Sequence, residues 1–196
     1  MNAEPILKYT AEEYLELEET SLEKNEFYKG EIFAMAGASI PHNQIVANSL
    51  IEIGNYLKDK KCRIFPSDLK IHAFTNSLFT YPDLSIVCGK IETLLNKKDI
   101  VTNPTVLIEV LSETTQDYDR GAKFKLYRDI ESLKEYILIS SLETLVEKYD
   151  KQTDGSWVLH EYKSETDAFK ITSIDLLVTV KDLYRDVDFE NAGNTA

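Results

Sequence analysis

Hydrophobic and polar positions along this chain fall into blocks with either helical or strand-like spacing. Between about Asn43 and Asp59 the apolar side chains keep to one helix face, which predicts a long amphipathic helix packed on a core. Short apolar runs bounded by turn residues predict buried strands at 83–88, 105–111 and 136–140. A hairpin is predicted where 145–149 and 157–162 flank the turn sequence Thr153-Asp154-Gly155-Ser156.

The N-terminal part predicts a short helix and a strand. Residues 9–17 form the helix, with Thr10 as its N-cap and Glu13 completing a capping box. A strand is expected over 26–36, associated with a turn at Lys29-Gly30.

Two further segments complete the predicted fold. Residues 63–74 indicate one or two strands, and 114–130 indicate a helix in their last part, beginning near Asp119 because Gly121 is a poor helix former. The order of elements predicts an α/β protein with a mixed β-sheet flanked by helices and an additional C-terminal β-hairpin. We expect a single domain over 1–188 and a disordered tail over 189–196.

Composition is that of an ordinary globular protein. The 196 residues are 43% hydrophobic and 29% charged, and no apolar run approaches the ~20 residues of a membrane helix. No signal peptide is recognisable at the N-terminus. Cys62 and Cys88 lack the spacing of metal ligands, and their neighbours are apolar. This predicts two buried free thiols in a cytoplasmic protein with no membrane contact.

The formal net charge of −12 argues against a broad nucleic-acid-binding surface, because phosphate binding depends on Lys and Arg. Two local basic clusters, at 58–63 and 96–98, are candidates for such contacts. A solvated helix end and a solvated loop explain them better.

Two acidic residues in apolar surroundings are the first candidates for chemistry. Glu109 lies in the run Val106-Leu107-Ile108-Glu109-Val110-Leu111, where an isolated carboxylate costs several kcal/mol unless it is paired, protonated or bound to a metal. Asp83 opens a strand directly after Pro82. If the two strands are neighbours, both carboxylates can bind one Mg²⁺ ion, with Mn²⁺ as the alternative. A turn-capping Asp83 and a Glu109 paired with an arginine are the competing structural interpretation.

A lysine beside this pair would favour chemistry. The strand position that shares a face with Glu109 is occupied by Leu111, but the following helix places Asp119, Lys123 and Tyr127 on one stripe, bordering the buried side. Lys123 could stabilise charge on a phosphorane or orient a water. The alternative is an ordinary salt bridge between Asp119 and Lys123.

Several other polar residues are secondary candidates. Glu31 could complete a metal shell, or could be a surface glutamate after a turn. His42, like Tyr127, is a candidate substrate contact, although His42 could simply cap its loop. Asp68 and Lys70 alternate along a strand and could line a cleft or face solvent.

An ordered string of motifs resembles a known family. Tyr81-Pro82-Asp83 is followed by 107–112, 119–128 and 135–139 in a pattern similar to the Uma-two family, bacterial proteins assigned as restriction endonucleases of the PD-(D/E)XK nuclease superfamily. The segment Tyr28–Ile32 and the position of His42 agree with it, and the resemblance covers roughly residues 8 to 185.

The resemblance implies a restriction-endonuclease-like fold, Mg²⁺ dependence and hydrolysis of DNA phosphodiester bonds. On matching positions, Asp83 and Glu109 would be the metal ligands and Lys123 the migrated lysine, while Leu111 and Glu113 depart from the family pattern. Such folds often dimerise to cut two strands, so a homodimer is expected by analogy. A catalytically silent binding module, and a hydrolase of RNA or another phosphoester, are the alternatives.

Overall fold

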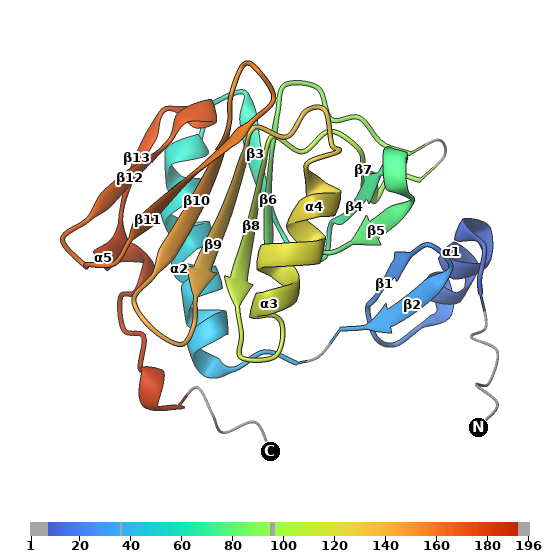
Figure 1. The fold of residues 1–196 in the computed structure, drawn as a ribbon, viewed down its shortest axis with the longest axis horizontal. Coiled ribbons are helices and arrows are strands. Elements are labelled where there is room, and N and C mark those ends of the chain that lie inside the picture. The colour runs from blue at the N-terminus through green and yellow to red at the C-terminus, as the bar shows by residue number, and fades with distance from the viewer. Residues whose placement is uncertain (1–7, 36, 95–96, 192–196) are drawn as a thin grey trace.

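The chain folds around a six-stranded mixed β-sheet (Figure 1). The computed structural model describes residues 8–35, 37–94 and 97–191. In this sheet β8 and β9 pair in parallel, whereas the other neighbouring strands pair antiparallel. In spatial order its strands are β11 (Trp157–Tyr162), β10 (Val146–Lys151), β9 (Glu135–Ser140), β8 (Val106–Leu111), β6 (Leu84–Cys88) and β3 (Cys62–Pro66).

A second, five-stranded sheet lies beside the first (Figure 1). It consists, in order, of β2 (Glu31–Ala34), β1 (Asn25–Tyr28), β5 (Leu78–Thr80), β4 (Lys70–Ala73) and β7 (Ile100–Val101). The short helix α1 (Ala11–Thr20) packs on it through Tyr14, whose ring stacks on Phe27. A third, two-stranded sheet, β12 (Ala168–Ile171) and β13 (Leu176–Thr179), follows near the C-terminus.

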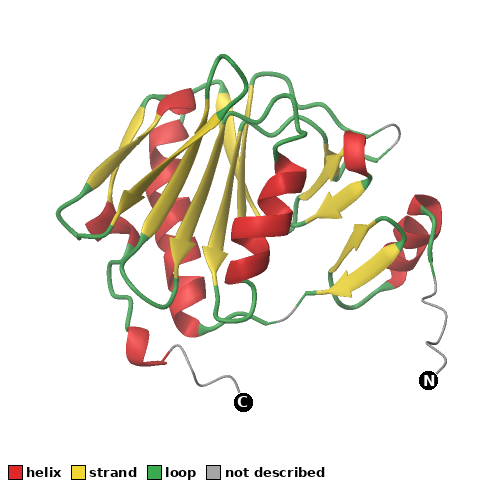
Figure 2. Cartoon of the chain, viewed as in Figure 1, coloured by secondary structure: helices red, strands yellow, loops and turns green. Residues whose placement is uncertain are grey.

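Helices cover both faces of the large sheet, as Figure 2 shows. The long helix α2 (Ile40–Leu57) packs on one face together with β12 and β13. The opposite face is covered by a helical segment made of α3 (Gln116–Tyr118), a π-helical turn (Asp119–Lys123) and α4 (Phe124–Tyr127). The remaining short elements are α5 (Val180–Leu183) and the 3₁₀ turns Phe74–Asn76, Thr172–Ile174 and Phe189–Asn191.

Strand alternation decides which helix each side chain of β8 meets. Successive side chains point to opposite faces of a sheet. Ile108 and Val110 accordingly belong to the apolar cluster under α2, whereas Leu107 and Leu111 belong to the cluster under α4. Glu109 therefore points toward the α3–α4 segment.

The predicted fold class is confirmed, with changes in detail. The Thr10 capping box is present, with Glu13 N donating to Thr10 Oγ1 (3.1 Å) and Thr10 N donating to Glu13 Oε2 (2.7 Å). The predicted helix at 43–59 is α2, and the predicted C-terminal hairpin is β10–β11.

Two helix and strand boundaries were wrong. The strand expected over 26–36 is the hairpin β1–β2, because the positive φ angles of Lys29 (50°) and Gly30 (90°) reverse the chain. The helix expected near Asp119 is already helical at Gln116 and runs through Gly121 in its π-helical turn.

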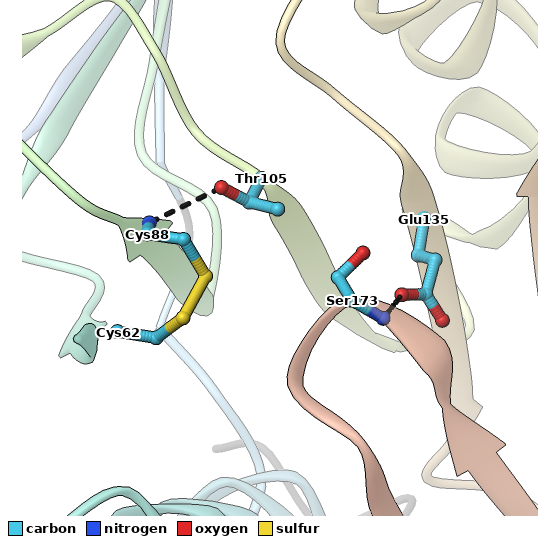
Figure 3. The surroundings of a disulfide bond; sticks show 5 residues. All are labelled: Cys62, Cys88, Thr105, Glu135 and Ser173. Atoms are coloured by element: carbon cyan, nitrogen blue, oxygen red, sulfur yellow. Dashed lines mark hydrogen bonds between the residues drawn. A yellow bond between two sulfur atoms is a disulfide. The ribbon is translucent and has the colours of Figure 1, made fainter. Parts of the chain in front are cut away.

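The prediction of two free thiols was also wrong. Cys62 and Cys88 form a disulfide between β3 and β6 (Figure 3). The antiparallel register places the two residues directly opposite each other, with Cα atoms 4.0 Å apart. Thr105 Oγ1 accepts a hydrogen bond from Cys88 N (3.2 Å). The thiols therefore no longer support the cytoplasmic location, which stays a prediction.

The C-terminal region is more ordered than expected. Phe189–Asn191 form a 3₁₀ turn, and the ring of Phe189 lies 5.7 Å from that of Tyr184, so the predicted disordered tail does not begin at 189. Residues 192–196 of that predicted tail lie outside the described residues.

Ser173 N donates to Glu135 Oε1 (2.6 Å) and ties the β12–β13 connection to β9 (Figure 3). Within the described ranges, no helix is both long and apolar enough to cross a membrane.

Candidate functional site

A buried lysine surrounded by carboxylates is the centre of the candidate site. Lys123 Nζ lies 2.9 Å from Glu109 Oε1, 3.2 Å from Glu26 Oε1 and 3.5 Å from Asp119 Oδ1. All four side chains are at most 10% exposed. We call Lys123, Glu109, Glu26 and Asp119 the lysine cluster.

Three separate parts of the fold supply the lysine cluster. Glu109 comes from β8, in the middle of the large sheet, and Glu26 comes from the β1–β2 hairpin. Asp119 and Lys123 are the first and last residues of the π-helical turn. π-Helical turns are rare and frequently mark functional sites. Here the turn carries two buried charged side chains on its sheet-facing side.

Asp83 and Glu109 lie next to each other on neighbouring strands. The register pairs Leu84 with Ile108, so Asp83 stands beside Glu109 at the start of β6. Asp83 N donates to Glu109 Oε2 (3.2 Å), and Val110 N donates to Asp83 Oδ2 (2.7 Å). Glu109 thus contacts both other predicted residues: its Oε2 accepts from the backbone N of Asp83, and its Oε1 pairs with the ammonium of Lys123.

Tyr127 and Thr80 donate hydrogen bonds to two carboxylates of the lysine cluster. Tyr127 Oη donates to Glu109 Oε1 (2.8 Å), and Thr80 Oγ1 donates to Glu26 Oε1 (2.5 Å). Both residues are fully buried. Tyr127 therefore belongs to the site as a partner of Glu109, whereas its predicted contact with substrate stays a prediction.

His42 contacts Asp83 from the first turn of α2. Its Nε2 lies 3.2 Å from Asp83 Oδ2, the oxygen that also accepts from Val110 N. Ser39, and not His42, caps the helix, because Ser39 Oγ accepts from His42 N (3.3 Å). His42 is thus placed to orient Asp83, whereas a contact with substrate stays a prediction.

Burial and charge set the protonation of the lysine cluster. Burial raises the pKa of Glu109 to about 8; the ammonium of Lys123 opposes this shift, and the charges of Asp119 and Asp83 add to it. Burial also raises the pKa of Asp119. Burial alone would discharge Lys123, but Glu109 and the other nearby acidic groups hold the pKa of its ammonium well above its usual value. Lys123 is therefore a permanent cation near neutral pH.

The oxygen ligands of Asp83 and Glu109 fit a hard cation such as Mg²⁺. Mg²⁺ is commonly bound through one or two carboxylates and keeps several waters. Among the described residues, however, no group of three or more His, Cys, Asp and Glu side chains is arranged to hold a metal ion. Glu31 lies on the edge strand β2, opposite Tyr28, and does not join Asp83 and Glu109 as the predicted third ligand.

Sequence reasoning missed Glu26 and Thr80. Local pattern gave no signal for Glu26, because β1 buries both Glu26 and Phe27 and so lacks the alternation of buried and exposed residues. The sequence offered Asp68 and Lys70 as residues that could line a cleft, but neither contacts the lysine cluster. Asp68 pairs with Lys24 at the surface (2.5 Å), and Lys70 is buried between aromatic rings, with its Nζ 4.8 Å from the centre of the Tyr14 ring.

Comparisons with known proteins point to one family. The sequence profile of the Uma2 (Uma-two) family, described as "Putative restriction endonuclease", matches residues 11–179. Two uncharacterized proteins of Synechocystis sp. are similar. One is 36% identical over 185 residues, covering 94% of this chain and 96% of its own length; the other is 37% identical over 156 residues, covering 80% and 88%.

A solved structure shares the fold. The crystal structure of a protein from Anabaena variabilis, described as a putative nuclease, superposes with a TM-score of 0.74 at 21% identity, covering 90% of this chain and 97% of that one. The profile match spans most of the chain and passes through every residue of the lysine cluster. The chain belongs to the Uma2 family of restriction-endonuclease-like proteins.

Proposed function

We propose that this protein is a Mg²⁺-dependent endonuclease that hydrolyses DNA phosphodiester bonds at the lysine cluster. The observation that carries the proposal is the meeting of Asp83, Glu109 and Lys123 from two adjacent strands and the covering helix. These are the residue types of the superfamily signature, with the lysine supplied by the helix and not by the strand position that Leu111 occupies.

Asp83 and Glu109 are the residues that would hold the metal. A bound divalent ion polarises a phosphoryl oxygen and lowers the pKa of a coordinated water. The chain contributes the geometry. Glu109 is held by Tyr127 Oη, and Asp83 is held by Val110 N and His42 Nε2. With two or more partners on these carboxylates, little side-chain freedom is left to lose on binding.

Lys123 would act as a fixed positive charge. Its raised pKa excludes service as a general base near neutral pH. A preorganised cation in a buried site stabilises negative charge that develops on a phosphorane, and it does so without reorganisation. Glu26 and Asp119 keep this ammonium charged and aimed at Glu109.

A catalytically silent binding module is the second candidate. Two observations favour it: Leu111 occupies the strand position of the superfamily lysine, and Lys123 is already engaged by three carboxylates. A hydrolase of RNA or another phosphoester would use the same cluster. We keep the expectation of a homodimer, which rests on analogy with related folds that dimerise.

A cleavage assay separates these candidates. Supercoiled plasmid, single-stranded DNA and RNA are incubated with the protein in Mg²⁺, in Mn²⁺ or in chelator. We expect DNA cleavage that requires the metal and that Asp83→Ala, Glu109→Ala and Lys123→Ala each abolish. Lys125→Ala is the matched control, because Lys125 lies two residues away on the exposed side of the same helix. Undiminished cleavage by any of the three variants removes that residue from the mechanism.

A further inference from the structure

Two exposed aromatic side chains border the lysine cluster. Tyr118 is 38% exposed and Phe33 is 45% exposed, whereas the neighbouring side chains of Lys123 and Glu26 are almost fully buried. A single exposed aromatic needs no explanation. Two that flank the same buried ion pair suggest a common role.

Tyr118 lies against Lys123. The centre of its ring is 6.0 Å from Lys123 Nζ. Burial of its inner side and the nearby carboxylate of Glu26 raise the pKa of Tyr118 to about 12. The phenol of Tyr118 is therefore uncharged near neutral pH. Its ring lies near Lys123 and is partly exposed to solvent.

Phe33 lies beside Glu26. The antiparallel register of β1 and β2 pairs Glu26 directly with Phe33. Directly opposed residues share one face of the sheet, with Cβ atoms about 4.5–5.5 Å apart. The ion pair between Glu26 and Lys123 (3.2 Å) joins the hairpin to the helical segment. Each partner of this ion pair has an exposed aromatic neighbour: Phe33 for Glu26 and Tyr118 for Lys123. Figure 1 shows the β1–β2 hairpin on the side of the molecule where α3 and α4 lie.

We propose that Tyr118 and Phe33 are stacking residues that bind unpaired nucleobases next to the scissile phosphate, and that the substrate is a single-stranded segment of DNA. This inference rests on the proposed function and names its substrate class. Aromatic side chains bind single strands by stacking on bases of any identity. Bases inside a duplex are already stacked on each other and become accessible only when flipped out.

The net charge of the protein disfavours a duplex more than a single strand. Double-stranded DNA carries about one negative charge per 1.7 Å of axis, so tight duplex binding requires many Lys and Arg contacts. The net charge of this chain is −12. A single strand carries about half this density of phosphate charge. Its unpaired bases can also stack on exposed aromatic side chains.

Fluorescence of 2-aminopurine tests the stacking without cleavage. An oligonucleotide carrying this base is titrated with the full-length protein in Ca²⁺, once as a single strand and once in a blunt duplex. We expect quenching and tight binding of the single strand only. Alanine substitution of a stacking residue typically weakens binding by roughly 5- to 150-fold. We expect this loss for Tyr118→Ala and Phe33→Ala, and retained binding for Tyr118→Phe and Tyr118→Trp.

Phe74→Ala is the matched control. Phe74 is 67% exposed and lies in the turn between β4 and β5, at the opposite end of β5 from Thr80. The proposal is overturned if the single strand is not quenched, if the duplex binds equally well, or if Tyr118→Ala and Phe33→Ala bind like Phe74→Ala. Cleavage in Mg²⁺ by the same samples is scored separately. Cleavage without stacking removes this inference alone. Stacking without cleavage removes the nuclease proposal and leaves a site that binds single strands without cutting them.

Discussion

Replacing Lys123 by methionine tests whether one ammonium holds the cluster together. At an effective dielectric constant of about 20, each contact of 2.9–3.5 Å corresponds to roughly 5 kcal/mol of gross attraction, most of which offsets the desolvation of the charges. Removing one partner of a buried pair costs about 3–5 kcal/mol, because the remaining charge is left buried and unpaired. In a chain of this length that is a fall in Tm of roughly 6–20 °C.

The pH dependence of this loss has a definite sign. Without Lys123, Glu109 and its acidic neighbours keep folded-state pKa values above those of the unfolded chain, since burial already raises the pKa of Glu109 to about 8. A group with a raised folded pKa loses stability as pH rises through that value. We therefore expect Lys123→Met to be more destabilising at pH 9 than at pH 6.

Thermal unfolding in chelator, followed by circular dichroism, is the assay. Lys125→Met is the matched control, because the exposed Lys125 loses the same charge from the same helix without uncovering buried acids. A fall in Tm for Lys123→Met no larger than for Lys125→Met would refute the reasoning. So would a loss of stability that does not change with pH.

Three further predictions concern other parts of the molecule. Asp83→Asn should raise Tm in chelator by roughly 2–4 °C for about 1 kcal/mol of relief, because it removes the Asp83 charge that raises the pKa of Glu109; a lower Tm would contradict this repulsion. Reduction of the disulfide Cys62–Cys88, which closes a loop with a sequence separation of 26, should cost about 3.5 kcal/mol by loop entropy, and reductant should leave the Tm of the double serine variant unchanged. Burial lowers the pKa of His72, so the free energy of unfolding should fall below pH of about 6.5, by at most about 1.4 kcal/mol per pH unit; chemical denaturation of His72→Phe should show a smaller slope, and an equal slope would argue against it.

The parts of the site that sequence could predict are those written in local patterns. Glu109 was visible because a carboxylate interrupts an apolar strand, and burial of that strand on both faces leaves it no solvent. Lys123 was visible because helical spacing placed it beside an apolar stripe. The π-helical turn over Asp119–Lys123 was not visible in that spacing.

Glu26 and the disulfide depend on contacts between distant segments. Glu26 meets Lys123 only because the β1–β2 hairpin packs against the helical segment, and nothing local to either segment specifies this. Glu31 looked equally suitable because both glutamates open strand-like stretches. Cys62 and Cys88 are opposite each other only in one register of β3 against β6. A shift of one residue in that register would turn their side chains to opposite faces.

The central claim is that Asp83 and Glu109 hold a divalent metal ion beside Lys123. A crystal structure of the protein soaked in Mn²⁺, with the ion located by its anomalous scattering, tests this claim most directly. We predict one or two ions bound to carboxylate oxygens of both Asp83 and Glu109. An anomalous map without a peak between these two side chains, at saturating Mn²⁺, would contradict the account.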